Sequence, residues 1–387
     1  MGAAALYTYK DLVDHCLDWL GANPSAEARR DARRAILEAM RTIGAASPWS
    51  YYLTAGRMAT VAPYATGTIS YDNTGGTYER MVTLTSGTWP DWAAFGWITI
   101  NNVPYEVSAR KSNTQITLTS SSNPGADVPA GTSYTLYRDS YPIPVDCRSI
   151  GAVVLPGYAV DLVMDHPNDW MERRKLYRGA ATPRSYSIFG DANYLNTLQV
   201  TFFPPPDAIY PVDLLYLRRP RALSLEEYSA GKVTTTADSA TVTGSGTEWA
   251  SRHVGSVFRV SRTREAPTAP WGANPTVCDR VVTAVNSSTS ITLDDVVPES
   301  LSSVPHVLSD PVDVEDGAML TALLRCCEMY LGVARAKANG PWLQQAYERE
   351  LIRAREADSR SFREETVGGR RPWPYRLAYM PIGPDVG

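Results

Sequence analysis

The stretch LQVTFFPPPDAIYPVDLLYLRRP, residues 198–220, decides how the middle of this chain folds. Two apolar, β-prone runs, 198–203 and 210–217, flank the consecutive prolines 204–206. Prolines cannot donate ladder hydrogen bonds, so they belong in the connection between two strands. Alternation assigns four apolar side chains to one face: Val200, Phe202, Leu215 and Leu217. The stretch therefore predicts a central β-hairpin with one buried side.

Two β-rich segments, residues 63–144 and 229–312, precede and follow this stretch. Short alternating apolar runs separated by turn residues predict a small sandwich or barrel in each segment. The second segment repeats four motifs of the first in the same order: SGTW (86–89) as SGTEW (245–249), SNTQITL (112–118) as SSTSITL (287–293), GTI (67–69) as GKV (231–233), and Gly96 as Gly255. Four ordered matches predict a duplicated module, with 263–275 as an extra loop in the second copy. Two copies are too few for a solenoid.

Helical periodicity is confined to the two ends of the chain and to one central segment. Apolar spacing predicts helices at 9–20 and at 26–43, the latter capped by Ser25 and ended by Gly44. The strongest pattern spans 316–338, and a charged helix with a thin apolar stripe follows at 342–365. Pro167 suits the first turn of a central helix. The four terminal helices are expected to form a bundle beside the hairpin.

These elements predict an α+β fold: a discontinuous helical bundle with a central β-hairpin, plus two duplicated small all-β modules. The chain has 387 residues, enough for two to four domains. The expected segments are N-terminal helices of the core (1–62), a first β module inserted in it (63–144), the central helix and hairpin of the core (145–228), a second β module (229–312), C-terminal helices of the core (313–366) and an extended C-terminal arm (367–387).

Composition excludes several classes of protein. The formal net charge is −4, so the chain lacks the overall basic footprint of a protein that grips nucleic acid. No apolar run is long enough for a transmembrane helix, and the first residues do not match a secretory signal. The five cysteines are scattered and show no CxxC spacing, which favours reduced, buried thiols.

Motifs for catalysis, cofactors or metal ions are also missing from the sequence. None of the four histidines lies at metal-ligand spacing from another histidine or a cysteine, and HExxH, GxSxG, Walker and GxGxxG motifs do not occur. Asp161, Asp165 and Asp169 are interpreted as helix-capping and surface carboxylates. Cys326 and Cys327 are adjacent in a predicted helix, so at most one is expected in the core. We therefore expect no enzyme activity, no cofactor and no metal.

The last residues, 367–387, have paired glycines, prolines and aromatic residues in place of any periodicity. They cannot form a helix and are too short to fold alone. Tyrosine and tryptophan carry a polar group on an apolar ring and suit surfaces that a partner half-buries. We therefore predict an arm that docks on another chain through five residues: Arg370, Arg371, Trp373, Tyr375 and Tyr379.

The overall plan resembles the head–tail adaptor (connector) proteins of tailed bacteriophages, over nearly the whole chain. The resemblance rests on the helix pair 9–43, the central stretch 199–220 and the helices 316–365. SGTEW and VGSVFRV, within 245–260, followed by SSTSITL, are similar to a small β module that recurs in phage adaptor and tail proteins. The chain departs from simpler adaptors because it carries this module twice.

The resemblance implies a structural virion protein of the head–tail connector, assembled in the host cytoplasm. It implies a ring, commonly a dodecamer, beneath the portal protein, with helices around a channel through which double-stranded DNA passes non-specifically. The arm would reach into the portal, and the β modules would face outward or meet a downstream nozzle or tail-terminator protein. No membrane is involved. The helix expected between subunits would use six residues: Trp342, Tyr347, Leu351, Arg353, Arg355 and Phe362.

Two other classes of function stay open at this stage. A tail-associated carbohydrate- or receptor-binding protein would use the aromatic β modules as sugar platforms. A cell-wall hydrolase would need an acid/base pair, for which the sequence offers no pattern.

Overall fold

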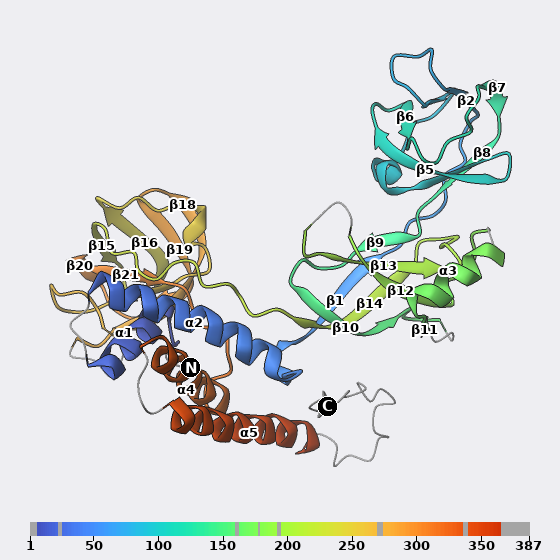
Figure 1. Cartoon of the computed structure of the whole chain (residues 1–387). Coiled ribbons are helices and arrows are strands. Elements are labelled where there is room, and N and C mark those ends of the chain that lie inside the picture. The colour runs from blue at the N-terminus through green and yellow to red at the C-terminus, as the bar shows by residue number, and fades with distance from the viewer. Residues whose placement is uncertain are drawn as a thin grey trace, which may run out of the picture. The chain divides into compact units, whose positions relative to one another are not determined.

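The computed structural model describes residues 6–21, 25–158, 162–176, 179–191, 195–268, 274–335 and 340–364, and of 176 and 360–364 the backbone alone. The chain divides into two compact units (Figure 1). The terminal unit comprises Met1–Tyr51 and Pro220–Gly387, and the middle unit is Tyr52–Arg219. Helices and strands occur in both units, which confirms the predicted α+β class.

Four helices of the terminal unit come from the two ends of the chain: α1 (Tyr9–Leu20), α2 (Ala26–Ala46), α4 (Ala318–Ala334) and α5 (Gly340–Glu364). The side chains of Thr8 and Asp11 form a reciprocal capping box at the start of α1, and Gly21 ends the helix in a left-handed conformation. Helix α4 packs against both α2 and α5. The predicted pairing of N-terminal with C-terminal helices is therefore confirmed within this unit.

Helix α2 continues past the glycine that was expected to end it. It runs to Ala46, with Gly44 inside its last turn. A Cβ atom on Gly44 would lie 2.8 Å from Cγ of Pro220, so glycine here permits a close approach of the chain. The indole of Trp49 donates a 2.7 Å hydrogen bond to the carbonyl of Ile43 and satisfies one of the last backbone acceptors.

The two β modules have the same topology. The first β module contains seven strands: β2 (Ile69–Asp72), β3 (Met81–Leu84), β4 (Trp97–Ile100), β5 (Val103–Arg110), β6 (Gln115–Leu118), β7 (Val128–Thr132) and β8 (Tyr134–Tyr137). The second β module contains their counterparts in chain order: β15 (Lys232–Thr235), β16 (Ser239–Ser245), β17 (Val257–Val260), β18 (Cys278–Ser287), β19 (Ser290–Val297), β20 (Leu301–Val304) and β21 (His306–Ser309).

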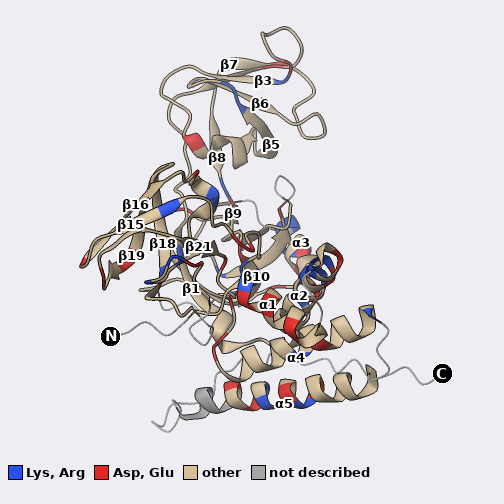
Figure 2. Cartoon of the chain, turned by 90° about the vertical axis from the view of Figure 1, so that its left-hand side faces the viewer, with Lys and Arg blue, Asp and Glu red and all other residues tan. Residues whose placement is uncertain are grey.

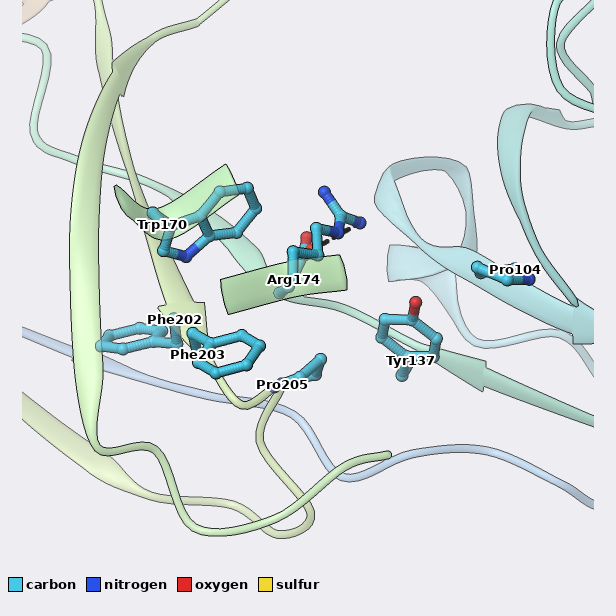
Figure 3. A pocket seen from close by; sticks show the side chains of 8 residues that line it. Pro104, Tyr137, Trp170, Arg174, Phe202, Phe203 and Pro205 are labelled. Carbon is cyan, nitrogen blue, oxygen red and sulfur yellow. Dashed lines mark ion pairs between the residues drawn. The ribbon is translucent and has the colours of Figure 1, made fainter. Parts of the chain in front are cut away.

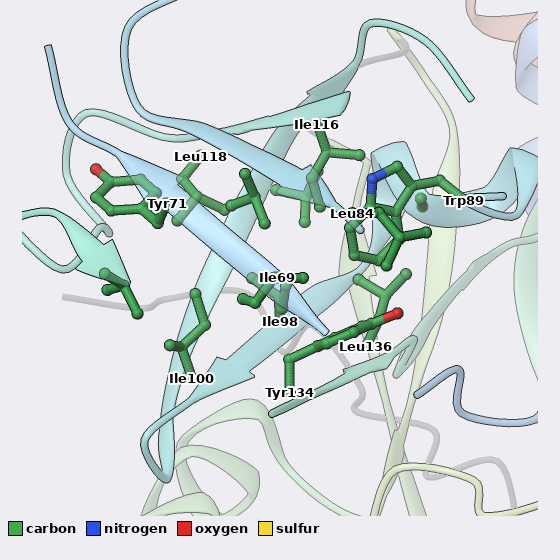
Figure 4. Close-up of a cluster of buried hydrophobic side chains, with 14 residues drawn as sticks. Ile69, Tyr71, Leu84, Trp89, Ile98, Ile100, Ile116, Leu118, Tyr134 and Leu136 are labelled. Carbon is green, nitrogen blue, oxygen red and sulfur yellow. The ribbon is translucent and has the colours of Figure 1, made fainter. Parts of the chain in front are cut away.

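Each module forms one nearly closed, barrel-like sheet. The hydrogen-bonded order is β7-β2-β3-β6-β5-β4-β8 in the first and β20-β15-β16-β19-β18-β17-β21 in the second. Replacing each strand by its counterpart converts one order into the other, so the predicted duplication is confirmed. Figure 4 shows the apolar core that the sheet of the first module encloses.

Backbone contacts fix which residues of the two modules correspond. Trp89 and Trp249 follow equivalent strands, and in each case the indole N–H is buried without an acceptor in the described part of the chain. The match of Gly96 with Gly255 is wrong by one residue. Gly96 accepts a hydrogen bond from Val107, and the residue in the same position of the second module is Ser256, which accepts from Val282. Gly255 precedes that position.

The rest of the middle unit consists of two sheets that share one core. One sheet has the order β1 (Leu53–Ala59), β14 (Pro211–Arg218), β10 (Cys147–Val154). The other has the order β11 (Val163–Met164), β12 (Ser185–Gly190), β13 (Leu198–Phe203), β9 (Ser140–Pro142). Helix α3 (Pro167–Leu176) begins at the predicted proline and packs beside β12. Buried side chains of both sheets form a single cluster, so this part of the unit is a sandwich.

The predicted central β-hairpin is wrong, although both of its strands exist. β13 pairs with β12 and β9, whereas β14 pairs with β1 and β10. The prolines 204–206 connect two different sheets because a proline-rich connection of this length cannot make the two-residue turn that joins neighbouring strands. Val200 and Phe202 are buried as predicted. On β14 the opposite face is buried, with these residues in the core: Val212, Leu214 and Tyr216.

Candidate functional site

The described residues hold no group of three or more histidine, cysteine or carboxylate side chains that could bind a metal ion. Asp165 is buried and forms a 3.2 Å ion pair with Arg173. Asp169 lies in the first turn of α3, where a carboxylate is favoured by the helix dipole. Asp161 lies outside the described residues. Asp165 and Asp169 have structural explanations, and the expected lack of enzyme activity stays a prediction.

All five cysteines are buried and free. The expectation that at most one of Cys326 and Cys327 lies in the core is wrong, because α4 is covered on more than one side. The thiol of Cys326 lies near the phenol of Tyr347 of α5, and that of Cys327 lies near Cys16 of α1. Burial raises the pKa of Cys326 to about 12, so this thiol is a poor nucleophile at neutral pH.

The structure describes five of the six residues predicted to lie between subunits, and they do not share one surface. Tyr347 is buried against α4, Leu351 is half-buried, and Arg355 donates a hydrogen bond to the carbonyl of Ala46 within the same chain. Trp342 and Arg353 are exposed. The side chain of Phe362 and all five residues of the predicted arm lie outside the described residues. A role of these residues in subunit contacts stays a prediction.

Helix α5 has a buried stripe and an opposite, exposed stripe. The buried stripe contacts α4 and includes Leu343, Ala346 and Ala354. Two large apolar side chains of the helix are exposed, Trp342 at 61% and Ile352 at 56% exposure. Nine residues separate Ile352 from the buried Leu343, which places Ile352 opposite the buried stripe, whereas Trp342 lies four residues before the buried Ala346 and so at the border of that stripe. Basic and acidic residues alternate along the helix (Figure 2).

The middle unit contains a cleft of about 870 Å³ between the first β module and the two-sheet sandwich. The volume lies within the range of about 300–1,000 Å³ that is typical of small-molecule sites. Four aromatic side chains line it: Phe95, Trp97, Trp170 and Phe189. Hydroxyl and amide side chains include Ser140, Gln199 and Thr201. The charged lining consists of three arginines, Arg110, Arg138 and Arg174, and two carboxylates, Glu106 and Asp191.

Two tryptophan rings and a carboxylate hold Arg174, one of these arginines, in place. The guanidinium of Arg174 lies 4.4 Å from the ring centre of Trp97 and 5.0 Å from that of Trp170. Arg174 also forms a 3.2 Å ion pair with Asp139, a carboxylate that is almost fully buried. Burial raises the pKa of Asp139, and the nearby Arg174 lowers it. Such stacked guanidinium groups keep a fixed orientation.

A smaller recess of about 170 Å³ adjoins this cleft, and Trp170 and Arg174 line both (Figure 3). The indole N–H of Trp170 is buried and has no acceptor among the described residues. Figure 3 shows this nitrogen on the edge of the ring that faces Phe202 and Phe203. Sequence analysis did not single out the cleft, because its residues come from elements of the module, of α3 and of the sandwich that are far apart in the chain.

In the terminal unit, one buried arginine adds to the backbone contacts that join the second β module to α1, among them the hydrogen bond from Lys10 to Ser309. Arg259 of β17 donates hydrogen bonds to Asp11 of α1 at 2.7 Å and to Asp279 at 3.1 Å and 3.3 Å. All three side chains are buried. The corresponding strand of the first module, β4, carries Trp97, which contacts Arg174 of α3. Equivalent strands therefore attach each module to its own unit by different chemistry.

The core of the second β module contains two buried histidines, His253 and His306. Both ring nitrogens of His306 lack partners in the described part of the chain. Tyr134 occupies the equivalent position in the first module. His306 pairs with the last residue of β17 and packs against Trp249, and Tyr134 pairs with the last residue of β4 and packs against Trp89. Burial, and the charge that His253 would carry, lower the pKa of His306 to about 4.

Comparisons with protein-family models and with curated proteins found no match to this chain. In the portion of the chain that the structure describes, no helix combines the length and the apolar character needed to cross a membrane.

Proposed function

We propose that this protein is a structural, non-enzymatic head-to-tail adaptor of a tailed phage, and that it forms a ring under the portal. The observation that supports this most is the exposed stripe of α5. A helix that packs on α4 through one stripe, exposes Ile352 on the opposite side and exposes Trp342 near its start suits a position between two neighbours. In a ring each copy meets the next through two different patches, so the exposed stripe would contact another part of the next copy.

Other features fit the same proposal. The ring would be a dodecamer whose channel conducts double-stranded DNA, and a net charge of −4 avoids strong attraction to DNA phosphates. The residues 367–387 would dock on the portal protein. The two β modules would provide surfaces for the downstream tail component, which gives the duplication a use. The protein would be located in the virion, at the junction of head and tail.

The test is the mass and shape of the full-length protein, alone and with portal protein. Native mass spectrometry is expected to give a ring-sized oligomer, and negative-stain electron microscopy a closed ring that attaches to portal. A monomer that persists at high concentration and ignores portal would contradict the proposal.

A deletion separates the role of the arm from that of the ring. Removing residues 367–387 is expected to leave the melting temperature and the oligomer unchanged and to abolish co-purification with portal. Undiminished co-purification would show that the portal contact lies elsewhere in the chain.

A further inference from the structure

Of the three arginines that line the middle-unit cleft, Arg110 and Arg174 form ion pairs with Asp91 and Asp139, whereas Arg138 has no ion pair within the described part of the chain. Nε of Arg138 donates a 2.7 Å hydrogen bond to the carbonyl of Ser140, and the guanidinium lies 4.8 Å from the ring centre of Tyr141 and 5.2 Å from that of Phe95. No carboxylate of the described residues lies within ion-pair distance of it. The backbone bond and the two rings restrict its motion, so its terminal N–H groups form a fixed donor pair at the cleft wall.

A fixed guanidinium edge is the group that recognises a carboxylate or another oxyanion through two parallel hydrogen bonds. Arg174 does not offer this edge freely, because it is already paired with Asp139. The ligand chemistry that fits Arg138 is therefore anionic.

The remaining walls of the cleft fit a sugar better than a peptide. Phe95 is 47% exposed and Phe189 is half-buried, so both offer ring surface to the C–H groups of a pyranose. Ser140, Gln199 and Thr201 supply hydrogen-bonding groups for hydroxyls. An extended peptide would bind by adding a strand to β9, the edge of its sheet, but β9 has only three residues and ends at Pro142.

We propose that this cleft binds an acidic oligosaccharide, with a carboxylate or sulfate of the sugar on Arg138 and a sugar ring against Phe95. The volume of about 870 Å³ accommodates a short oligosaccharide. The site lies wholly within the middle unit and uses no residue of α5, so it stands or falls independently of ring formation.

The experiment is isothermal titration calorimetry of the full-length protein with three acidic probes: trigalacturonate, trisialic acid and a heparin-derived tetrasaccharide. Maltotriose is the neutral control, and hexaglutamate represents an acidic peptide. At least one acidic saccharide is expected to bind, and maltotriose is expected to bind at least tenfold more weakly. Arg138→Gln should weaken acidic binding about tenfold or more, because a hydrogen bond to a charged group is lost.

Two further variants keep the result interpretable. Arg57→Gln removes one positive charge from β1 in the same unit, where Arg57 is exposed, paired with Asp213 and outside the cleft, and it is expected to leave binding unchanged. Phe95→Ala removes an exposed ring and should weaken binding even if Arg138→Gln fails to fold. The proposal is overturned if no acidic saccharide binds at millimolar concentration, if maltotriose binds equally well, if both cleft variants bind like wild type, or if hexaglutamate binds in preference to the saccharides.

Discussion

Arg259 shows what a single buried charge contributes to the terminal unit. Its guanidinium lies between the carboxylates of Asp11 and Asp279, all of them buried, and it also donates to the backbone carbonyl of Leu6 at 2.6 Å. We expect Arg259→Met to lower the free energy of unfolding by about 3–5 kcal/mol, because two carboxylates stay buried without a counter-charge. Denaturant unfolding monitored by circular dichroism measures this change.

The matched control for Arg259 is Arg262, which pairs with Glu299 at the surface of the same module. Arg262→Gln is expected to leave the denaturation midpoint unchanged, since exposed ion pairs contribute little to stability. Equal shifts in the two variants would contradict a special contribution of the buried ion pairs of Arg259 with Asp11 and Asp279 to stability.

His306 makes the stability of the second module dependent on pH. Its pKa of about 4 in the folded chain is below the ordinary value of 6.5, so the unfolded chain binds a proton more readily. The contribution of the neutral imidazole to the free energy of unfolding is therefore complete above about pH 6.5, and it is lost as the pH falls towards 4. We expect a loss of about 2 kcal/mol between pH 7 and pH 5 from this group.

Replacing the histidine separates its titration from that of other groups. His306→Phe keeps an aromatic ring in the core and is expected to reduce the loss of unfolding free energy between pH 7 and pH 5. Denaturant unfolding at both pH values measures the difference. If the variant shows the same pH dependence as wild type, other groups, such as His253, cause the effect.

At the scale of elements, we predict that the exposed apolar residues of α5 are needed for ring assembly. Ile352→Ser combined with Trp342→Ala removes both exposed apolar side chains of the helix. In the double variant the protein concentration at which the ring forms is expected to rise at least tenfold. The melting temperature should change little, because more than half of each side chain is exposed in the single chain. Analytical ultracentrifugation measures the shift. Ile209→Ser, at a residue 67% exposed in the middle unit, is the control and should assemble like wild type.

The elements were largely predictable from sequence, whereas their pairing was not. Apolar spacing located α1, the capping residue Ser25 located the start of α2, and Pro167 located α3, because these signals act within a few residues. The partners of β13 and β14 depend on strands far apart in the chain, and local alternation carries no information about them. Asp213 could have corrected the face of β14, since it shares a side with Leu215 and Leu217 and pairs with Arg57 at the surface.

The same limit explains why the cleft was missed. Arg138 lies just after the first module, Phe95 within it and Arg174 on α3, and only the fold brings them to one cavity. In contrast, repeated motifs revealed the duplication, because the comparison of two segments needs no knowledge of their contacts. Gly96 was matched with Gly255 because both are glycines. The backbone hydrogen bonds show that Gly96 corresponds to Ser256 instead.

At the scale of the whole molecule, the middle unit is a single insertion between the helices of the terminal unit. The chain enters it through β1 and leaves through β14, and these strands pair with Leu53 opposite Leu217. Paired residues lie about 5 Å apart, so a short linker can replace everything between them. We expect a chain in which glycine and serine replace residues 53–218 to keep the cooperative thermal unfolding of the terminal unit.

The complementary half of this test uses residues 52–219 expressed alone. This segment has its own core and is expected to show dispersed amide signals in nuclear magnetic resonance spectra. A segment without a cooperative transition, or a shortened chain that loses its helical signal, would show that the two units fold only together.

The pairing of Leu53 with Leu217 also has a genetic meaning. Two crossover points in the coding sequence, one at each end of the middle unit, suffice to acquire, exchange or discard that unit as a cassette, because the flanking protein experiences little more than the opening or closing of a loop. The cleft and the first β module travel with such a cassette, and the host helices can evolve without them.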